Sequence, residues 1–274
     1  MIITIIGLGI IGGSYAKGLT KTGHTVYGID KNLETIEYAK SNGYIIDGST
    51  EVNQFVTMAD LVVFGLYPND IVPFIKNNLS FFKKGQVVTD VCGVKECICE
   101  EATSLLKDSY FVGSHPMAGR EKVGIKFADE KIFLGTNFLL CPIASTNEVA
   151  VDVVSKMAKD LGFGRIHQIS PKFHDEMIAY TSQLTHAIAV SLVNSTTSDE
   201  VVKFIGDSYR DLTRIAMINE MLWSQLFIEN KAALTEQIDS FISELELMKT
   251  AINTENLDLL KEKFVSSKKK REVM

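Results

Sequence analysis

The chain has 274 residues, of which 46% are hydrophobic and 23% charged, an ordinary globular composition that excludes wholesale disorder. Its 28 lysines and arginines against 34 aspartates and glutamates leave a net charge of −6, which argues against nucleic acid as a partner. No apolar run approaches the roughly 18 residues that a membrane span requires, and no basic signal-peptide segment precedes the first apolar run.

The first 169 residues alternate short apolar runs with helical patterns. The predicted strands are 2–6, 25–29, 61–64, 87–89, 110–112, 138–141 and a last short one near 165–169. The predicted helices are 10–20, 33–42, 70–77 and 95–106, followed by one whose apolar face carries Val151, Val154, Met157, Ala158 and Leu161. Because the strands lack polar–apolar alternation, both of their faces should be buried, as in a parallel sheet. We therefore predict an α/β, Rossmann-type, doubly wound and mainly parallel sheet over residues 1–169.

From Ser170 onward the pattern is helical only. Ser170 and Pro171 have the residue types of a helix N-cap and a first helical position, and no strand-like run follows them. A later apolar seam with 4-3-4-3-4 spacing comprises Leu234, Ile238, Phe241, Leu245, Met248 and Ile252. Such a seam packs helix on helix, either within the domain or between two subunits. We expect an all-α dimerisation domain over residues 170–274 and favour a homodimer through these C-terminal helices.

A glycine fingerprint joins the first predicted strand to the first helix, and it reads Gly7-Leu8-Gly9-Ile10-Ile11-Gly12. The pattern is weak alone, but here a strand precedes it, a helix follows it, and Asp30 ends the second strand 23 residues after Gly7. The glycines permit a tight turn and the approach of a pyrophosphate to the helix N-terminus. Asp30 would bond the adenosine ribose hydroxyls and repel a 2′-phosphate, which favours NAD over NADP, although Lys31 would soften that repulsion.

Ligands of doubly wound sheets bind beyond the carboxyl ends of the strands. This rule places Leu66-Tyr67-Pro68 and the segment Asp90-Val91-Cys92-Gly93 along the cofactor, with Cys92 as a small neutral residue near the nicotinamide. The chain's cysteines are Cys92, Cys97, Cys99 and Cys141. Because they have neither metal nor redox spacing, we expect no metal site and free thiols in a reducing cytoplasm.

A histidine follows the predicted strand at 110–112, at the rim where the nicotinamide is expected. It is His115, in the run Gly113-Ser114-His115-Pro116-Met117-Ala118-Gly119. Removal of hydride from a carbinol carbon needs a base for the hydroxyl proton, and histidine titrates close to neutrality. His115 is therefore the candidate base, although a loop histidine is more often structural or merely exposed.

The motifs together resemble the prephenate dehydrogenase family. They are the nucleotide fingerprint, Ser114-His115-Pro116-Met117-Ala118-Gly119, Ser182-Gln183-Leu184-Thr185-His186 and Arg210-Asp211-Leu212-Thr213-Arg214-Ile215-Ala216. The resemblance extends over nearly the whole chain, and the order and spacing of the motifs are more specific than any single one. It implies a Rossmann domain followed by a helical dimerisation domain. It also implies NAD-dependent oxidative decarboxylation of prephenate to 4-hydroxyphenylpyruvate in tyrosine biosynthesis, with His115 as the catalytic base.

The resemblance also implies a set of substrate-binding residues. Arg214 matches the family's carboxylate-binding arginine, which suits a dianion because a planar guanidinium can hold a carboxylate with two hydrogen bonds. Helix ion pairs of Asp207 with Arg210 and of Asp211 with Arg214 would explain both arginines without a substrate. The remaining candidates for the substrate pocket are Arg210, His186, Gln183 and Ser114.

Gly93 departs from the family's common pattern. A serine is usual at this position, and its hydroxyl helps to orient the catalytic histidine. A backbone N–H, a water molecule or Ser114 would have to take that role here, or the geometry and pKa of His115 differ. His174-Asp175 resembles a family motif for which we expect a structural role.

Three alternatives stay open. Arogenate dehydrogenase makes tyrosine directly from a substrate that differs by an amine in place of the keto group. A β-hydroxyacid dehydrogenase usually has a catalytic lysine at the head of the helical domain, where this chain has Gln183 and His186. An inactive dinucleotide sensor would not need the intact His115 and Arg214, although Gly93 slightly favours it.

Overall fold

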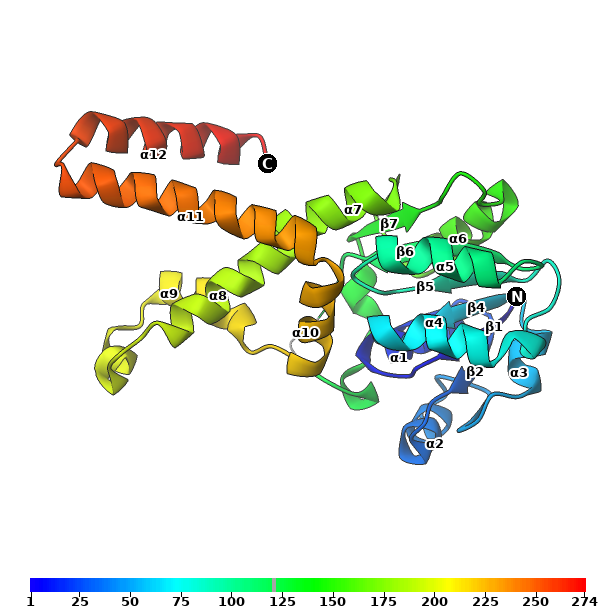
Figure 1. Cartoon of the computed structure of the whole chain (residues 1–274). Coiled ribbons are helices and arrows are strands. Elements are labelled where there is room, and N and C mark those ends of the chain that lie inside the picture. Colours follow the sequence, from blue (N-terminus) through cyan, green and yellow to red (C-terminus); the bar gives the residue numbers. More distant parts are fainter. Residues whose placement is uncertain (120–121) are drawn as a thin grey trace. The chain divides into compact units, whose positions relative to one another are not determined.

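The computed structural model describes residues 1–119 and 122–274. Its contacts divide the chain into a first unit, Met1–Asn230, and a second unit, Lys231–Met274. The first unit holds the sheet and the helices up to α10, and the second holds α11 and α12 (Figure 1).

The elements of the first unit follow the predicted alternation closely. The strands are β1 (Ile2–Ile6), β2 (Thr25–Ile29), β3 (Asp47–Ser49), β4 (Leu61–Phe64), β5 (Val87–Asp90), β6 (Tyr110–Pro116), β7 (Asn137–Cys141) and β8 (Arg165–Gln168). The helices are α1 (Ile10–Lys21), α2 (Leu33–Ser41), α3 (Gln54–Met58), α4 (Pro68–Asn77), α5 (Glu96–Leu105), α6 (Glu148–Asp160), α7 (Pro171–Ile178), α8 (Leu184–Asn194), α9 (Asp207–Thr213) and α10 (Glu220–Glu229). A π-helical segment, Ala179–Gln183, joins α7 to α8, and a 3₁₀ turn, Arg214–Ala216, follows α9.

The strands of the described residues form one sheet in the order β3-β2-β1-β4-β5-β6-β7-β8. All neighbours are parallel except β6 and β7, which are antiparallel. The crossover between β3 and β4 makes the carboxyl ends of β1 and β4 the switch point where such sheets bind ligands.

Two features of the sheet differ from the sequence prediction. The edge strand β3 was not predicted, because Asp47-Gly48-Ser49 has none of the β-branched or aromatic residues typical of strands, and it joins the sheet through backbone pairing with β2. The strand β6 extends past residue 112, since Gly113 to Pro116 pair with β7. His115 therefore lies within a strand, opposite Leu139, and not in a loop.

The sheet is covered on both faces. Ile3 and Ile5 of β1 belong to one apolar core, which they share with residues of α1 and α6. Ile6 belongs to the other core, which it shares with Ile71 of α4 and Ile98 of α5. Figure 1 shows α4 and α5 side by side over this second face. These two buried cores explain why the strands read as continuous apolar runs, and they confirm the doubly wound fold.

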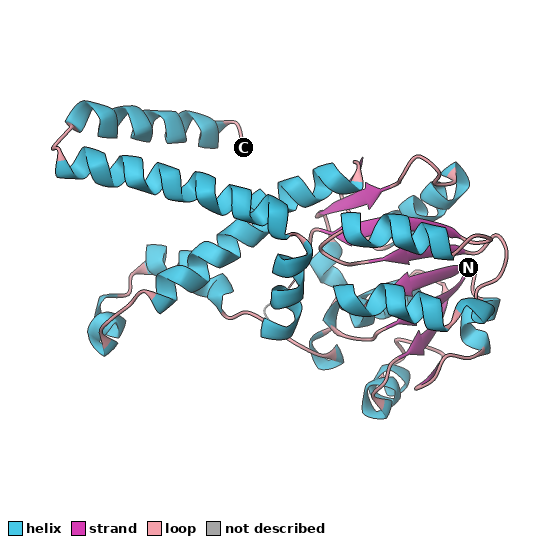
Figure 2. Ribbon diagram, viewed as in Figure 1, coloured by secondary structure: helices cyan, strands magenta, loops and turns pink. Residues whose placement is uncertain are grey.

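After β8 the described chain is helical to its end, as Figure 2 shows. The helices α7 and α10 lie within the first unit, where α7 contacts α5 and α10 contacts α4. The compact units therefore divide at residue 230, and the predicted domain boundary at residue 169 stays a prediction.

The second unit is a helical hairpin of α11 (Lys231–Asn253) and α12 (Leu257–Glu272). An ion pair of 2.8 Å between Lys263 and Glu244 joins the two helices. Leu245 and Ile252 of the predicted seam are 49% and 60% exposed, so this unit leaves part of the seam uncovered. No helix in the described ranges is both long and apolar enough to span a membrane.

Candidate active site

The glycine loop between β1 and α1 has the geometry that a dinucleotide requires. Gly7 has φ +91°, and a Cβ there would lie 2.5 Å from the carbonyl oxygen of Gly65. A Cβ at Gly12 would lie 1.9 Å from the oxygen of Gly7, whereas one at Gly9 would meet no atom within 4 Å. Gly7 and Gly12 are thus required by the backbone. The space at Gly9 is open where a pyrophosphate would approach the first turn of α1, which begins with Ile10 and Ile11.

Asp30 lies at the end of β2 and holds this loop. Its Oδ2 accepts a hydrogen bond of 2.8 Å from Leu8 N, and its Oδ1 accepts one of 2.9 Å from Asn32 N. A carboxylate has about four acceptor sites, so ribose hydroxyls could still bond to it. The side chain of Leu8 is buried and its N–H donates to Asp30, so Leu8 stabilises the conformation of the loop. Lys31 is exposed beside Asp30.

The segment after β4 joins the glycine loop to α10. Leu66 lies beside Gly7, where a Cβ would be 3.0 Å from its Cδ2. The hydroxyl of Tyr67 accepts a hydrogen bond of 3.1 Å from Asn219, and Pro68 begins α4. Cys92, on the neighbouring loop, is 5% exposed, and burial raises its pKa to about 12. Its thiol is therefore neutral at physiological pH, and its place near the nicotinamide stays a prediction.

A buried ion pair supports the ends of β5 and β6. Asp90 and Lys95 are both 0% exposed, and Lys95 Nζ donates to Asp90 Oδ2. The other oxygen of Asp90 accepts a hydrogen bond of 3.0 Å from Ser114 N. The hydroxyl of Ser114 donates to the carbonyl oxygen of Asp90 at 2.6 Å. Ser114 is thus buried and bonded to β5, while His115, as the next residue of the strand, points to the opposite face.

His115 bonds to a second histidine that the sequence analysis had assigned only a structural role. Its Nδ1 lies 2.8 Å from Nε2 of His174 on α7, and Nδ1 of His174 lies 2.6 Å from Oδ1 of Asp175. Asp175 also accepts hydrogen bonds from Lys95 N at 2.9 Å and Glu96 N at 2.8 Å, at the start of α5. Burial is the main cause that holds the pKa of His115 well below its usual range, and positive charge on a protonated His174 or on Lys95 would lower it further. His115 is therefore unprotonated at neutral pH, as a base must be.

The helix α10 extends the site from His115 toward α8. A Cβ at Gly93 would lie 3.2 Å from Cδ2 of Leu226 and 3.8 Å from Cε1 of His115, so Gly93 lies between the two side chains. Trp223, one turn before Leu226, stacks on the ring of His186 with centroids 3.6 Å apart. Nδ1 of His186 lies 2.9 Å from the carbonyl oxygen of Ser182 and must therefore carry the ring proton, since a carbonyl oxygen can only accept. His115 and His186 are thus connected by the Leu226 and Trp223 side of α10.

The other predicted substrate residues are Gln183, Arg210 and Arg214, and their surroundings differ. Gln183 is 1% exposed, donates to the Leu226 oxygen at 3.0 Å and accepts from Asn230 at 2.8 Å, so its amide serves the framework. Arg210 is exposed and pairs with Asp207 at 2.7 Å, as an ordinary helix ion pair would. Arg214 lies in the turn after α9, which packs against α8, the helix of His186. The helix α9, which carries Arg210, also packs against α8, so what sets Arg210 apart is its exposed ion pair with Asp207.

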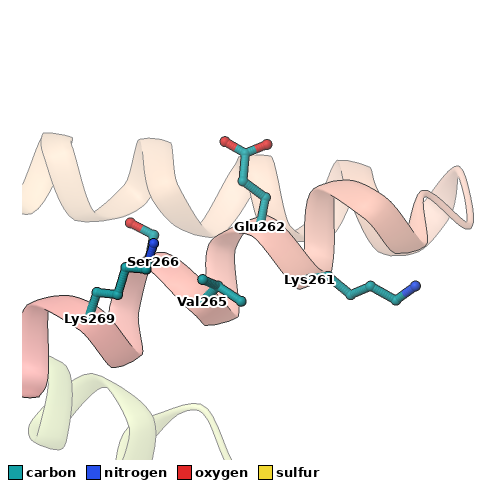
Figure 3. Close-up of a pocket in the computed structure, with 5 residues that line it drawn as sticks. All are labelled: Lys261, Glu262, Val265, Ser266 and Lys269. Atoms are coloured by element: carbon teal, nitrogen blue, oxygen red, sulfur yellow. The ribbon is translucent and has the colours of Figure 1, made fainter.

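Three residues of the site were missed by sequence reasoning. His174 and Asp175 were noted as a motif, but nothing local placed them against His115. Trp223 is the only tryptophan of the chain, and that rarity is the one sequence signal that could have drawn attention to it. A separate shallow hollow on α12, shown in Figure 3, contains no predicted site residue and is lined by Lys261, Glu262, Val265, Ser266 and Lys269.

Comparison with known proteins gives matches over nearly the whole chain. The family model described as the nucleotide-binding domain of prephenate dehydrogenase matches residues 15–167, and that of its dimerization domain matches residues 170–266. Prephenate dehydrogenase of Bacillus subtilis is 29% identical over 98% of this chain and 75% of its own length. Cyclohexadienyl dehydrogenase of Zymomonas mobilis is 30% identical over 98% of this chain and 94% of its own length.

A solved structure is also similar along the whole chain. It is prephenate dehydrogenase from A. aeolicus in complex with hydroxyphenyl propionate and NAD+, which is 28% identical with a TM-score of 0.89. The match covers 99% of this chain and 98% of the other. With both family models matched in sequence order and the predicted motifs assembled in one unit, this chain belongs to the prephenate dehydrogenase family.

Proposed function

We propose that this chain is an NAD-dependent prephenate dehydrogenase that converts prephenate to 4-hydroxyphenylpyruvate in tyrosine biosynthesis. The observation that carries the proposal is the position of His115 at the end of β6, beside Gly93 of the β5–α5 loop, where the nicotinamide end of a dinucleotide is expected. The family membership and the NAD complex of the A. aeolicus relative support the same cofactor.

The residues divide the reaction among them. Bound NAD would supply the hydride acceptor. His115 takes the proton of the ring hydroxyl, so that the carbinol carbon becomes a carbonyl as hydride leaves, and the ring carboxylate is lost as carbon dioxide with aromatisation. Arg214 holds a carboxylate of the dianion, and the His186–Trp223 stack forms an aromatic wall for the ring. The protein mainly orients the ring against the cofactor and supplies the base.

Cofactor choice and assembly follow from the same residues. Asp30 favours NAD, since its carboxylate would repel a 2′-phosphate. The exposed seam residues Leu245 and Ile252 and the match to the dimerization domain support a homodimer through the C-terminal helices. The unpaired cysteines support a reducing cytoplasmic location.

The test is a spectrophotometric assay of NADH formation with prephenate, with arogenate as an alternative substrate and NADP as an alternative cofactor. We expect turnover with prephenate and NAD. His115→Asn should abolish it and leave NAD affinity unchanged, whereas the same change at His167, which is exposed on β8, should have no effect. Turnover of arogenate alone would replace the proposed substrate, and full activity in His115→Asn would remove His115 as the base.

A further inference from the structure

Resting on the proposed function, we infer that His174 and Asp175 are a positioning pair, which fixes the proton of His115 on Nδ1 and leaves Nε2 as its basic nitrogen. Neither residue would touch the substrate, and the pair acts through the ring of His115. Both residues thus have a functional role in addition to the structural role expected from the sequence.

The ionised carboxylate of Asp175 can only accept hydrogen bonds. The backbone N–H groups of Lys95 and Glu96 donate to this carboxylate and orient it at the first turn of α5. The third partner is Nδ1 of His174 at 2.6 Å, so this nitrogen must carry the proton. The tautomer of His174 is thereby set by a carboxylate that is itself fixed on a helix N-terminus.

The tautomer of His174 in turn determines the tautomer of His115. Burial lowers the pKa of His174, whose side chain is 0% exposed, so the ring is neutral and its Nε2 has a lone pair. Nδ1 of His115 lies 2.8 Å from that lone pair and must be the donor. A neutral imidazole has one N–H, so Nε2 of His115 is left unprotonated.

Other groups near His115 do not take this orienting role. Gly93 has no side chain, and the hydroxyl of Ser114 is already donated to Asp90. The remaining charged neighbour is Lys95, which is paired with Asp90. Within the residues that the structure describes, His174 is thus the partner that the geometry gives to Nδ1 of His115.

The proton balance of the catalytic step follows. The substrate O–H bond breaks and an N–H bond forms at Nε2, while the Nδ1–H bond of His115 stays intact and donates to His174. The imidazolium formed in this way faces an acceptor that is backed by the negative charge of Asp175. A hydrogen bond to a charged group is stronger than a neutral one, so the pair stabilises the protonated base during the step.

Two substitutions of His174 separate its hydrogen bond to Asp175 from its hydrogen bond to His115. In His174→Asn the amide can replace Nδ1 and keep the bond to Asp175, but it cannot reach His115. In His174→Gln the amide oxygen can replace Nε2 and still accept from His115. We expect kcat to fall about 10- to 100-fold in His174→Asn and to stay within about fivefold of the parent in His174→Gln. The KM for NAD and the melting temperature serve as controls, because a purely structural role would change the latter in both variants.

The direct measurement is the tautomer of His115 in the full-length protein, read from ¹⁵N chemical shifts of labelled histidine. The chain has five histidines, and the signal of His115 is assigned with His115→Asn. We expect the Nδ1–H tautomer in the parent and in His174→Gln, and a mixture in His174→Asn. An Nε2–H tautomer in the parent, or an unchanged tautomer and kcat in His174→Asn, would overturn the inference.

This measurement distinguishes the inference from the function on which it rests. If the parent shows the expected tautomer but no substrate is turned over, the proposed function fails while the positioning pair stands. If the parent turns over prephenate but His174→Asn leaves both kcat and tautomer unchanged, the positioning pair fails alone.

Discussion

Removal of one charge from the buried Asp90–Lys95 pair should destabilise the protein strongly. Lys95→Met keeps most of the side-chain volume and deletes the ammonium. Burial has the largest single effect and lowers the pKa of Lys95, but Asp90, Cys92 and Cys99 together outweigh it, and the pKa is raised. Without Lys95, Asp90 would retain only the backbone N–H groups of Cys92 and Ser114 inside a fully buried site.

The expected loss is about 3–5 kcal/mol, the usual cost of leaving one member of a buried pair uncompensated. That is a large part of the roughly 5–15 kcal/mol by which a folded domain is stable. With a urea m-value of about 3 kcal/mol/M, the unfolding midpoint should fall by about 1–1.7 M. Urea titrations followed by circular dichroism would measure this shift.

Two control variants make the result specific. Lys203→Met removes one member of a surface pair with Glu200, whose side chains are 68% and 67% exposed, and it should cost less than about 1 kcal/mol. Asp90→Asn combined with Lys95→Met removes both buried charges and should recover most of the lost stability. If Lys95→Met cost no more than Lys203→Met, the buried pair would not be the support of the β5–β6 ends described above.

Two further predictions concern the substrate and pH. Arg214→Ala should raise the KM for prephenate by about 10- to 100-fold through loss of a charged hydrogen bond. Arg210→Ala should change this KM less than about twofold, because Arg210 is exposed and bonded to Asp207. If steady-state kinetics gave the opposite order, the carboxylate would be assigned to Arg210. Because burial lowers the pKa of both His115 and His174 from 6.5, the folded chain binds fewer protons than the unfolded one just below that pH. The contribution of these two histidines to the free energy of unfolding should therefore be at its maximum above about pH 6.5 and decrease as pH falls toward 5. Urea titrations across this window would check the sign, and a rise in stability on acidification, or an unchanged slope when both histidines are replaced by asparagine, would contradict it.

The sequence predicted the fold where local rules decide the structure. The glycine fingerprint specified its own turn, since Gly12 is required by the oxygen of Gly7, and the apolar strands followed from burial on both faces. The prediction failed for strand segments whose existence depends on pairing with a neighbouring strand. The strand β6 extends through His115 because β7 lies beside it, and β3 is a strand because β2 offers backbone groups to pair with.

The same distinction applies to the substrate residues. Resemblance to the family made Gln183 a candidate for the substrate pocket. In the structure Gln183 ends the π-helical segment Ala179–Gln183, and its buried amide bonds to Leu226 and Asn230. For the arginines, the i,i+3 pairing of Arg210 with Asp207 could be foreseen from the sequence, and it is what separates Arg210 from Arg214.

The partner of His115 shows most clearly why a motif cannot reveal a whole site. The absence of a hydroxyl at Gly93 raised the question of what orients His115, and the candidates considered were a backbone N–H, a water molecule and Ser114. The answer comes from His174, 59 residues away, because α7 packs against α5 and Asp175 caps the start of α5. An orienting group needs only the right atom at hydrogen-bond distance, and a folded chain can supply that atom from any element that reaches the site. A glycine in place of an expected polar residue is therefore weak evidence for lost catalysis until the distant elements around it have been placed.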